Sequence, residues 1–350
     1  MERCSYSVGR RHPEKEDTLI QDPFLNDFNK IIQSKSYRRL AYKTQVFTLP
    51  DNPHVRTRLM HTSEVMASSM MISENLGLNT NLCLAIAAGH DLGHTPYGHM
   101  GERLLSAIGR KKFKHHVNSV VVAQHIERKG KGLNLSYETL EGMLNHSRGS
   151  GELTVDDTLP QEYAAVMFAD KISYMFSDVN DALRYGDVSE HELPDAIRWL
   201  GFNQRTRTEK VIQALLDESR EKGHVQFSEG EVFEQFDELK TFMYDVVYPR
   251  LNGIVEALQG QMIPLIVKYF TDQPFFNGVD PVLLTSLLTD KECFYFQNIL
   301  STTRMPDVDQ LCNFGIFEII PYIKRKNIDY CDPDLGWKEK AIPDGKASGD

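Results

Sequence analysis

The sequence predicts an all-α protein. Apolar residues recur three and four positions apart through most of the 350-residue chain, and this spacing is typical of helices with one buried face. No strand-rich block interrupts the helical segments. Glycine and proline separate them instead, for example at Leu49–Pro53, Arg128–Gly132 and Arg148–Gly151, where we expect breaks between helices.

The helical segments are expected in a definite order. A helix begins at Pro23 and is followed by an extended piece around Thr44–Leu49. Further helices are expected at residues 61–75, 81–90, 100–108, 115–128, 137–145, 161–185, 194–200, 206–220, 230–248, 254–270 and 281–300. Segment 81–90 is apolar on nearly all sides, which is typical of a helix buried at the centre of a fold.

The composition divides the chain into four parts. Residues 1–22 are expected to form a polar N-terminal arm, and residues 23–190 a core that holds the candidate site. Residues 191–340 form a helical C-terminal region that completes the fold or serves as an oligomer interface. Residues 341–350 are rich in polar residues and glycine, so we expect a disordered tail.

Charge and cysteine content exclude some classes of function. The net charge of −10 argues against wholesale nucleic-acid binding, although a local basic pocket for a polyanionic small molecule remains compatible with it. The five cysteines form no CxxC pair, which indicates reduced thiols. No apolar run approaches the ~18 residues of a membrane span, and the start has no signal-peptide pattern. We therefore expect a cytoplasmic protein without a membrane partner.

The pair His90–Asp91 is the most informative feature. Together with His61 upstream and Asp170 downstream, it supplies two neutral nitrogen ligands and two anionic oxygen ligands, which suit Mn, Fe(II), Mg or Zn. An isolated His-Asp dipeptide is more often a polar helix end. Both side chains can reach one metal only if the helix ends there, which the following Leu92-Gly93 permits.

Two further patterns surround this pair. Arg58 lies three residues before His61, so the two share a helix face, where an arginine could hold a phosphate. On the segment around Asp170, a helical repeat places Lys171, Tyr174 and Asp178 about 100°, 40° and 80° away from it. This third of the helix surface is a ligand-contacting face or, alternatively, a buried salt-bridge network.

Spare histidines can supply acid and base groups. His94 and His99 follow the His-Asp pair within ten residues. His115 opens a helix whose dipole should lower its pKa and leave the ring neutral, unless it is only a polar helix start. His125 and His146 have no comparable context and are interpreted as structural or surface histidines. Three cations and one amide precede the site: Arg38, Arg39, Lys43 and Gln45. No glycine-rich phosphate loop accompanies them.

Four motifs resemble one known family. They are SKSYRRLAYKTQVF (34–47), RLMHTSEV (58–65), HDLGHTPYGH (90–99) and ADKISYMFSDVNDA (169–182), with a weaker match in LNLSYETLEGMLNH (133–146). They resemble the HD superfamily of metal-dependent phosphohydrolases, and more closely its dGTPase-like branch of deoxynucleoside triphosphate (dNTP) triphosphohydrolases. The resemblance covers about residues 30 to 185 and implies an HD-domain helical bundle with a helical C-terminal extension.

The resemblance also implies roles for individual residues. The metal ligands would be His61, His90, Asp91 and Asp170, for Mn, Mg or Fe(II), with Zn or Ni able to replace them in a crystal. The catalytic histidines would be His94, His99 and His115, and the substrate-binding residues Gln45, Arg58, Lys171, Tyr174 and Asp178. Within the last group, Gln45 would contact the sugar 3′-hydroxyl, and Arg58, Lys171 and Tyr174 the triphosphate.

The implied reaction converts a dNTP and water to a deoxynucleoside and inorganic triphosphate, by attack of water on the α-phosphorus. His99 or His115 would protonate the leaving 5′-oxygen. The sequence departs from the dGTPase-like branch at two positions. Asn118 stands near where relatives often carry an acidic partner for the catalytic histidine. Tyr42 stands where many relatives have glycine, beside the expected nucleoside pocket. By analogy, we expect a homo-oligomer (hexamer or tetramer), an activating second nucleotide, and single-stranded DNA as a further ligand.

Two other classes of function share these residues. A different HD phosphohydrolase, such as a nucleotide 5′-phosphomonoesterase or a phosphodiesterase, would use the same metal ligands but not the triphosphate set. The second alternative is a regulator that binds dNTPs or single-stranded DNA without hydrolysing them, although intact ligands at all four metal positions count against it. The reaction product separates the first alternative, since a triphosphohydrolase releases triphosphate and the other hydrolases release orthophosphate or a linear nucleotide. Absence of any turnover would favour the second alternative.

Overall fold

The computed structural model describes residues 1–14, 19–46, 54–147, 155–250, 260–302 and 315–338, without the side chains of 298–302. Over these residues the chain forms helices and turns, and β-pairing is limited to two isolated bridges, Arg10–Ser136 and Thr44–Thr57. The all-α prediction is therefore confirmed. Within the same ranges, no helix combines the length and hydrophobicity that a membrane span requires.

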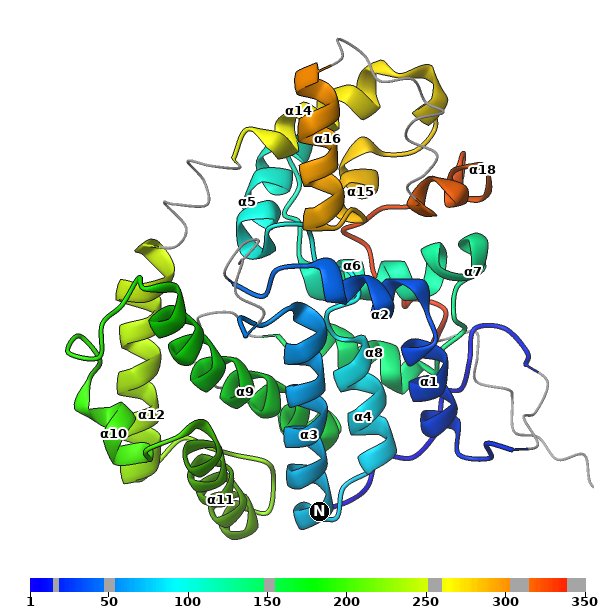
Figure 1. Cartoon of the computed structure of the whole chain (residues 1–350). Helices are drawn as coiled ribbons and strands as arrows, with labels where there is room; N and C mark the ends of the chain where they lie inside the picture. Colours follow the sequence, from blue (N-terminus) through cyan, green and yellow to red (C-terminus); the bar gives the residue numbers. More distant parts are fainter. Residues whose placement is uncertain (15–18, 47–53, 148–154, 251–259, 303–314, 339–350) are drawn as a thin grey trace, which may run out of the picture.

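Three helices form the centre of the molecule: α3 (Arg58–Leu76), α4 (Thr80–Gly89) and α9 (Gln161–Tyr185). They pack pairwise against one another (Figure 1). Helix α4 is buried on all sides, as its composition predicts: Ala85 and Ala88 belong to one hydrophobic cluster, and Leu82 and Ile86 to a second. Because α4 ends in the His-Asp pair, both clusters fix the position of that pair.

The helix boundaries follow local signals. Helix α1 (Pro23–Ile32) begins with proline after the Asp22 cap, and Ser34 starts α2 (Lys35–Arg39) by accepting a hydrogen bond from the Tyr37 backbone. Helices α3 and α9 end at Gly77 and Gly186, both with left-handed backbone angles. The remaining helices of the first half are η1 (Leu40–Tyr42), α5 (Gly98–Gly109), α6 (His115–Val121), η2 (Val122–Ile126), α7 (Glu127–Gly130) and α8 (Tyr137–Asn145).

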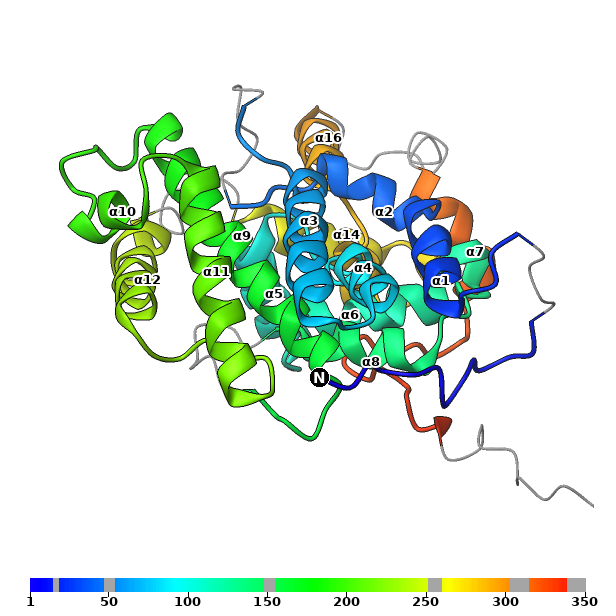
Figure 2. The ribbon, with the colours of Figure 1, turned by 90° about the horizontal axis from the view of Figure 1, so that it is seen from below.

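The later helices form two groups on different sides of the central three. One group packs beside α3 and α9: α10 (Asp195–Leu200), α11 (Gln204–Lys222), α12 (Glu231–Phe242) and the π-helical turn η3 (Met243–Val247). The other group packs against α5 and α7: α14 (Met262–Asp272), η4 (Pro274–Phe276), α15 (Pro281–Ser286), α16 (Asp290–Thr302), η5 (Gly315–Ile319) and α18 (Ile320–Ile323). Figure 2 shows α11 and α1 on opposite sides of α3 and α4.

The predicted helix 281–300 is wrong as one element, because the chain breaks between α15 and α16. Thr289 and Glu292 form a capping box that starts α16: the Thr289 backbone N–H donates to the Glu292 carboxylate (2.8 Å), and the Glu292 N–H donates to the Thr289 hydroxyl (3.2 Å). This arrangement places Asp290 at the buried start of the helix, where it reaches the loop before α5.

The N-terminal arm lies against the core along the described residues 1–14. The backbone N–H groups of Ser7 and Val8 donate to the Glu138 carboxylate at 2.8 Å, and Arg10 forms a buried ion pair with Asp27. The expected disordered tail, 341–350, lies outside the described residues. So does the start of the predicted helix 254–270, whose described part contains α14.

Candidate metal centre and hydrolytic site

The four predicted metal ligands meet where α3, α4 and α9 converge. The His61 Nε2 atom is 3.0 Å from Asp170 Oδ1, and His90 Nε2 is 3.5 Å from Asp91 Oδ2 and 3.9 Å from Asp170 Oδ1. Both imidazoles are buried. Donor atoms of His61, His90 and Asp170 all lie within 4.8 Å of one another, which is close enough for one ion.

The orientation of His90 fits a metal ligand. Its Nδ1 donates to the Ala87 carbonyl at 2.6 Å, so the lone pair is on Nε2, which points toward Asp91 and Asp170. That buried Nε2 atom makes no hydrogen bond within the described part of the chain. A buried lone pair between two carboxylates is unfavourable unless a cation or a proton lies there, so these residues fit a divalent metal.

The electrostatics keep the two carboxylates ionised. Burial alone would raise the pKa of Asp170, but the hydrogen bond and charge of His61 hold it well below its usual range. At Asp91 burial also raises the pKa, but the charges of His90 and Arg58 lower it by more, so the pKa lies well below its usual value. His61 has a raised pKa despite burial, because it donates to Asp170.

Helix α6 holds the His-Asp turn in place. The Ser119 hydroxyl donates to the His90 carbonyl at 2.7 Å, and the Asn118 amide donates to the Gly93 carbonyl at 2.7 Å. A Cβ atom at Gly93 would lie 2.2 Å from the Asn118 backbone, so only glycine permits this approach. The Asn118 side chain therefore holds the turn in position. It does not act as the partner of His115.

A cavity of about 320 Å³ opens beside the metal ligands. Every residue predicted for the site lines it except His90, which lies behind Asp91. The face of α9 is arranged as the helical repeat predicts, with Asp170, Lys171, Tyr174 and Asp178 all at the cavity wall. Burial lowers the pKa of Lys171 to about 8, and its ammonium group lies 5.6 Å from the centre of the Tyr174 ring.

Arg58 connects the metal ligands to Gln45. Its Nη1 donates to Asp91 Oδ2 at 2.6 Å, and its Nη2 donates to the Gln45 carbonyl at 3.0 Å. The Arg58 Nε and the Gln45 side-chain Oε1 are buried and have no hydrogen-bond partner among the described residues. Both groups therefore remain available to a polar ligand in the cavity.

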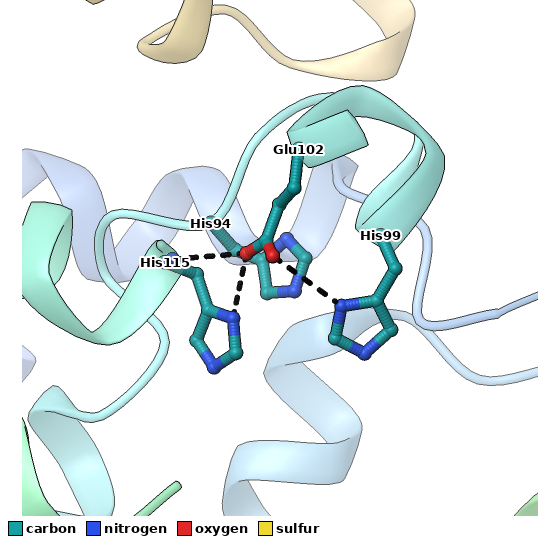
Figure 3. Close-up of side chains that lie close together, drawn as sticks. All are labelled: His94, His99, Glu102 and His115. Carbon is teal, nitrogen blue, oxygen red and sulfur yellow. Dashed lines mark hydrogen bonds and ion pairs between the residues drawn. The ribbon is translucent and has the colours of Figure 1, made fainter. Parts of the chain in front are cut away.

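Glu102 of α5 lies beside three histidines that line the cavity, His94, His99 and His115 (Figure 3). It accepts hydrogen bonds from the Nδ1 of His115 at 2.6 Å and from the His115 backbone N–H at 2.9 Å, and lies 3.7 Å from His99 Nδ1. The sequence analysis missed Glu102. Its spacing of three residues from His99 on α5 was the available signal, since such residues share a helix face.

The expected lowering of the pKa of His115 is wrong. Burial does lower it, but the adjacent charge of Glu102 and the hydrogen bond to it outweigh burial and raise the pKa above its usual value. The short helix α6 contributes a partial charge at most, whereas Glu102 brings a full negative charge within hydrogen-bonding distance. His115 is therefore stabilised in its protonated form.

Two tyrosines after residue 190 complete the cavity, where the sequence analysis expected few site residues. The turn η3 and its C-cap present Tyr244, which shares a 2.9 Å hydrogen bond with Tyr174, and Tyr248, which donates to Asp178 at 2.9 Å. Burial raises the pKa of Asp178 to about 7. A π-helical turn is a recurrent feature of functional sites, but this one is not visible in the apolar spacing.

Two other residues lie elsewhere than expected. His146, interpreted as structural, is buried beside His90 with a ring-centre distance of 4.9 Å, and its Nδ1 donates to the Met143 carbonyl at 2.7 Å. Tyr42, expected beside the nucleoside pocket, lines a different cavity, 5.2 Å from the ammonium group of Lys291. Tyr42 is therefore not a determinant of the site cavity.

The comparisons with known proteins agree with this geometry. The family model for the HD domain matches residues 58–175, which contain all four predicted metal ligands. The fold and the family model thus define a phosphohydrolase of the HD class, with His and Asp groups that could bind a metal.

Individual relatives narrow the class. A deoxyguanosinetriphosphate triphosphohydrolase-like protein of Caldanaerobacter subterraneus subsp. tengcongensis is 39% identical over 239 residues, which cover 68% of this chain and 68% of the relative. One from Clostridium perfringens (strain 13) is 41% identical over 247 residues, covering 69% and 71%. This chain belongs to the family of deoxyguanosinetriphosphate triphosphohydrolase-like proteins.

Proposed function

We propose that the protein hydrolyses dNTPs to deoxynucleosides and inorganic triphosphate. The observation that carries this proposal is the cavity itself. It joins the metal ligands, two cations suited to phosphates, and a wall of phenols and hydrogen-bonding groups suited to a sugar. The names of the relatives, which refer to dGTP triphosphohydrolase, favour the same substrate class.

His61, His90, Asp91 and Asp170 would hold the divalent metal, for which we propose Mn, Mg or Fe(II). When bound, such a metal supplies Lewis acidity that lowers the pKa of water toward ~7 and screens phosphoryl charge. The residues around the metal do the positioning. His90 is oriented by the Ala87 carbonyl, and Asp170 is held by His61, so the donor atoms keep their directions.

Arg58 and Lys171 would bind the triphosphate. Arg58 has an unpartnered Nε atom within the described structure and a planar fork that matches phosphate oxygens. The pKa of Lys171, about 8, leaves it mostly protonated at neutral pH, and a neighbouring phosphate anion would raise the pKa further. These two cations would also stabilise the negative charge that develops on the α-phosphoryl oxygens in the transition state.

Gln45 and Asp178 would contact the sugar. Each carries a buried oxygen without a hydrogen-bond partner in the described ranges, Gln45 Oε1 and Asp178 Oδ1. We propose that Gln45 meets the 3′-hydroxyl and that Tyr174 closes the space beside C2′, so that a ribose 2′-hydroxyl collides with the wall. If Tyr174→Ala and Gln45→Ala both leave the ratio of deoxy to ribo turnover unchanged, this assignment is wrong.

The leaving 5′-oxygen needs a proton, and Glu102 holds two candidate donors. His115 is buried and Glu102 raises its pKa, which favours the protonated form, whereas the His99 side chain is 67% exposed at the cavity rim. His94, fully buried between them, would orient the pair through its ring contacts. Proton donation of this kind is typically worth about 10²–10⁴-fold.

The first test is a product analysis. The protein with Mn²⁺ or Mg²⁺ is given each dNTP singly and then all four together, and the products are separated by ion-exchange chromatography. Deoxynucleoside with intact triphosphate is expected. Orthophosphate or pyrophosphate would instead favour another HD phosphohydrolase, and no turnover with any nucleotide would favour the non-catalytic regulator. If the activity depends on the His-Asp centre, Asp170→Asn should abolish it. Asp195→Asn, on an exposed residue of α10, is the matched control and should keep it.

Two proposals concern partners. We propose that a second nucleotide activates the protein, and that it assembles into a homo-oligomer, a hexamer or tetramer, through its C-terminal helices. Turnover that appears only in the dNTP mixture would support the first. Light scattering at several protein concentrations measures the second. Single-stranded DNA, a further proposed ligand, is tested by adding an oligonucleotide to either measurement.

A further inference from the structure

We propose that His94, His99, Glu102 and His115 form a second metal site, selective for Zn²⁺, whose occupation inhibits hydrolysis. The inhibitory part of this proposal rests on the proposed function, while the metal site does not. The four side chains come from two segments that fold together, the loop and start of α5 and the start of α6 (Figure 3). Their donor atoms all lie within 4.8 Å of one another.

The donor set differs from that of the first metal centre. Three imidazoles and one carboxylate are a typical tetrahedral set for Zn²⁺, whereas two imidazoles and two carboxylates suit harder ions as well. Nitrogen-rich sites bind Zn²⁺ more tightly than Mn²⁺. The histidine cluster is therefore expected to favour Zn²⁺, whereas the His-Asp centre accepts Mn²⁺, Mg²⁺ or Zn²⁺.

His94 gives an independent indication of a ligand. Its side chain is 0% exposed, yet neither ring nitrogen has a hydrogen-bond partner among the described residues. Its ring centre lies 4.7 Å from that of His115 and 5.3 Å from that of His99, so it points into the cluster. A buried imidazole with two unused nitrogens is costly unless a ligand meets one of them.

The cluster needs little rearrangement to hold the ion. Zinc bonds of ~2.0–2.2 Å place neighbouring donor atoms roughly 3.3–3.5 Å apart, so the cluster must contract. His99 can provide this movement because its side chain is 67% exposed. Glu102 stays in place, because the His115 backbone N–H also donates to it at 2.9 Å. The ion would take the place of the hydrogen between His115 Nδ1 and Glu102.

Inhibition follows from that exchange. A zinc ion bound to one ring nitrogen of His99 and of His115 would leave each ring only the proton on its other nitrogen, which a metal-bound imidazole releases poorly, so neither could protonate the leaving oxygen. Zn²⁺ would therefore inhibit protein that is saturated with Mn²⁺ by binding at the histidine cluster.

The test is equilibrium dialysis of the full chain against Zn²⁺, with metal content measured per chain. The wild type is expected to bind two ions, Glu102→Gln and His94→Asn one each, and Asp170→Asn one. His191→Ala, an exposed histidine outside both sites, should keep two. Glu102→Gln preserves volume and a hydrogen bond, so it guards against a variant that fails to fold. One ion in the wild type, or two in both cluster variants, would overturn the proposal.

The second readout is activity with Mn²⁺ fixed and Zn²⁺ titrated. Zn²⁺ should inhibit the wild type, and the residual activity of Glu102→Gln should be insensitive to it. Equal sensitivity of both would overturn the inhibitory role. If the wild type binds two ions but hydrolyses no dNTP, the proposed function fails and the metal site stands.

Discussion

Two cavities of the described structure differ in size and in how their polar groups are paired, and the smaller one holds the candidate site. The larger cavity, about 1370 Å³, lies beside α1, α2, α7 and α16, and several charged side chains in its wall have partners within the protein. Arg39 pairs with Glu292 at 2.5 Å, and Lys35 with Glu318 at 3.1 Å. The charges of these side chains are thus neutralised within the protein.

The smaller cavity, about 320 Å³, is different in kind. Gln45, His94 and Asp178 each direct a buried polar atom toward it, and those atoms lack hydrogen-bond partners over the described chain. A buried polar atom without a partner destabilises the fold by roughly 1–3 kcal/mol. Such atoms indicate where a bound ligand would supply the missing hydrogen bond. Unpaired polar groups therefore locate the chemistry better than volume does.

The largest expected effect is at the metal centre. Asp170→Asn removes a metal ligand and the partner of His61, so we expect dNTP turnover to fall by roughly 10³-fold or more. Steady-state kinetics with Mn²⁺ measure this, with Asp195→Asn as the control. Activity within tenfold of the wild type would mean that the smaller cavity is not the hydrolytic site.

Glu102→Gln should have the next largest effect, a fall of about 10²-fold in kcat, because it removes the charge that holds His115. A general acid works only while protonated, so the rate falls as pH rises through its pKa. Since Glu102 raises the pKa of His115, its loss should move this fall to lower pH. An unchanged pH profile of kcat/KM would assign the acid role to His99 instead.

Tyr248→Phe tests the wall contributed by the C-terminal region. The phenol donates to Asp178 and favours its ionised form, so its loss should raise the pKa of Asp178 above its present value of about 7. A charged hydrogen bond contributes about 1.5–3 kcal/mol, and we expect kcat/KM to fall roughly tenfold near pH 7 and to recover at higher pH. Tyr295→Phe, on an exposed ring of the larger cavity, is the matched control.

Asp290→Asn tests the connection between α16 and the site. The Asp290 carboxylate accepts from the Thr44 backbone N–H at 2.9 Å and from the Tyr97 backbone N–H at 3.0 Å, and it also accepts from the Thr44 hydroxyl. An amide offers one oxygen where two are used, so we expect about 1–3 kcal/mol less stability against urea. Turnover should fall only a few-fold, and unchanged stability would show that α16 is dispensable to the site.

The smallest effect is expected in the larger cavity. Arg38→Ala changes an exposed residue there, so turnover of a single dNTP should change less than about twofold. The same variant in a dNTP mixture sharpens the comparison. A loss of activation in the mixture alone would identify the larger cavity as the place where a second nucleotide acts.

Local regularity explains what could be predicted from the sequence. The helical repeat put Asp170, Lys171, Tyr174 and Asp178 on one face of α9, because that spacing depends only on neighbours along the chain. The apolar composition of segment 81–90 likewise predicted a central helix that ends in the His-Asp pair. The all-α class and the family followed from the same kind of local signal.

The tertiary structure decided which distant segments meet. It brought Glu102 to His115, His146 to His90, and Tyr244 and Tyr248 to the face of α9. It also reversed the expected pKa shift of His115, because a full charge at 2.6 Å outweighs the dipole of a short helix. Helical spacing determines the direction of a side chain on its own element, whereas its partner depends on how whole helices pack. The sequence by itself therefore determined the ligand types and the helix faces, and packing alone decided their partners and protonation.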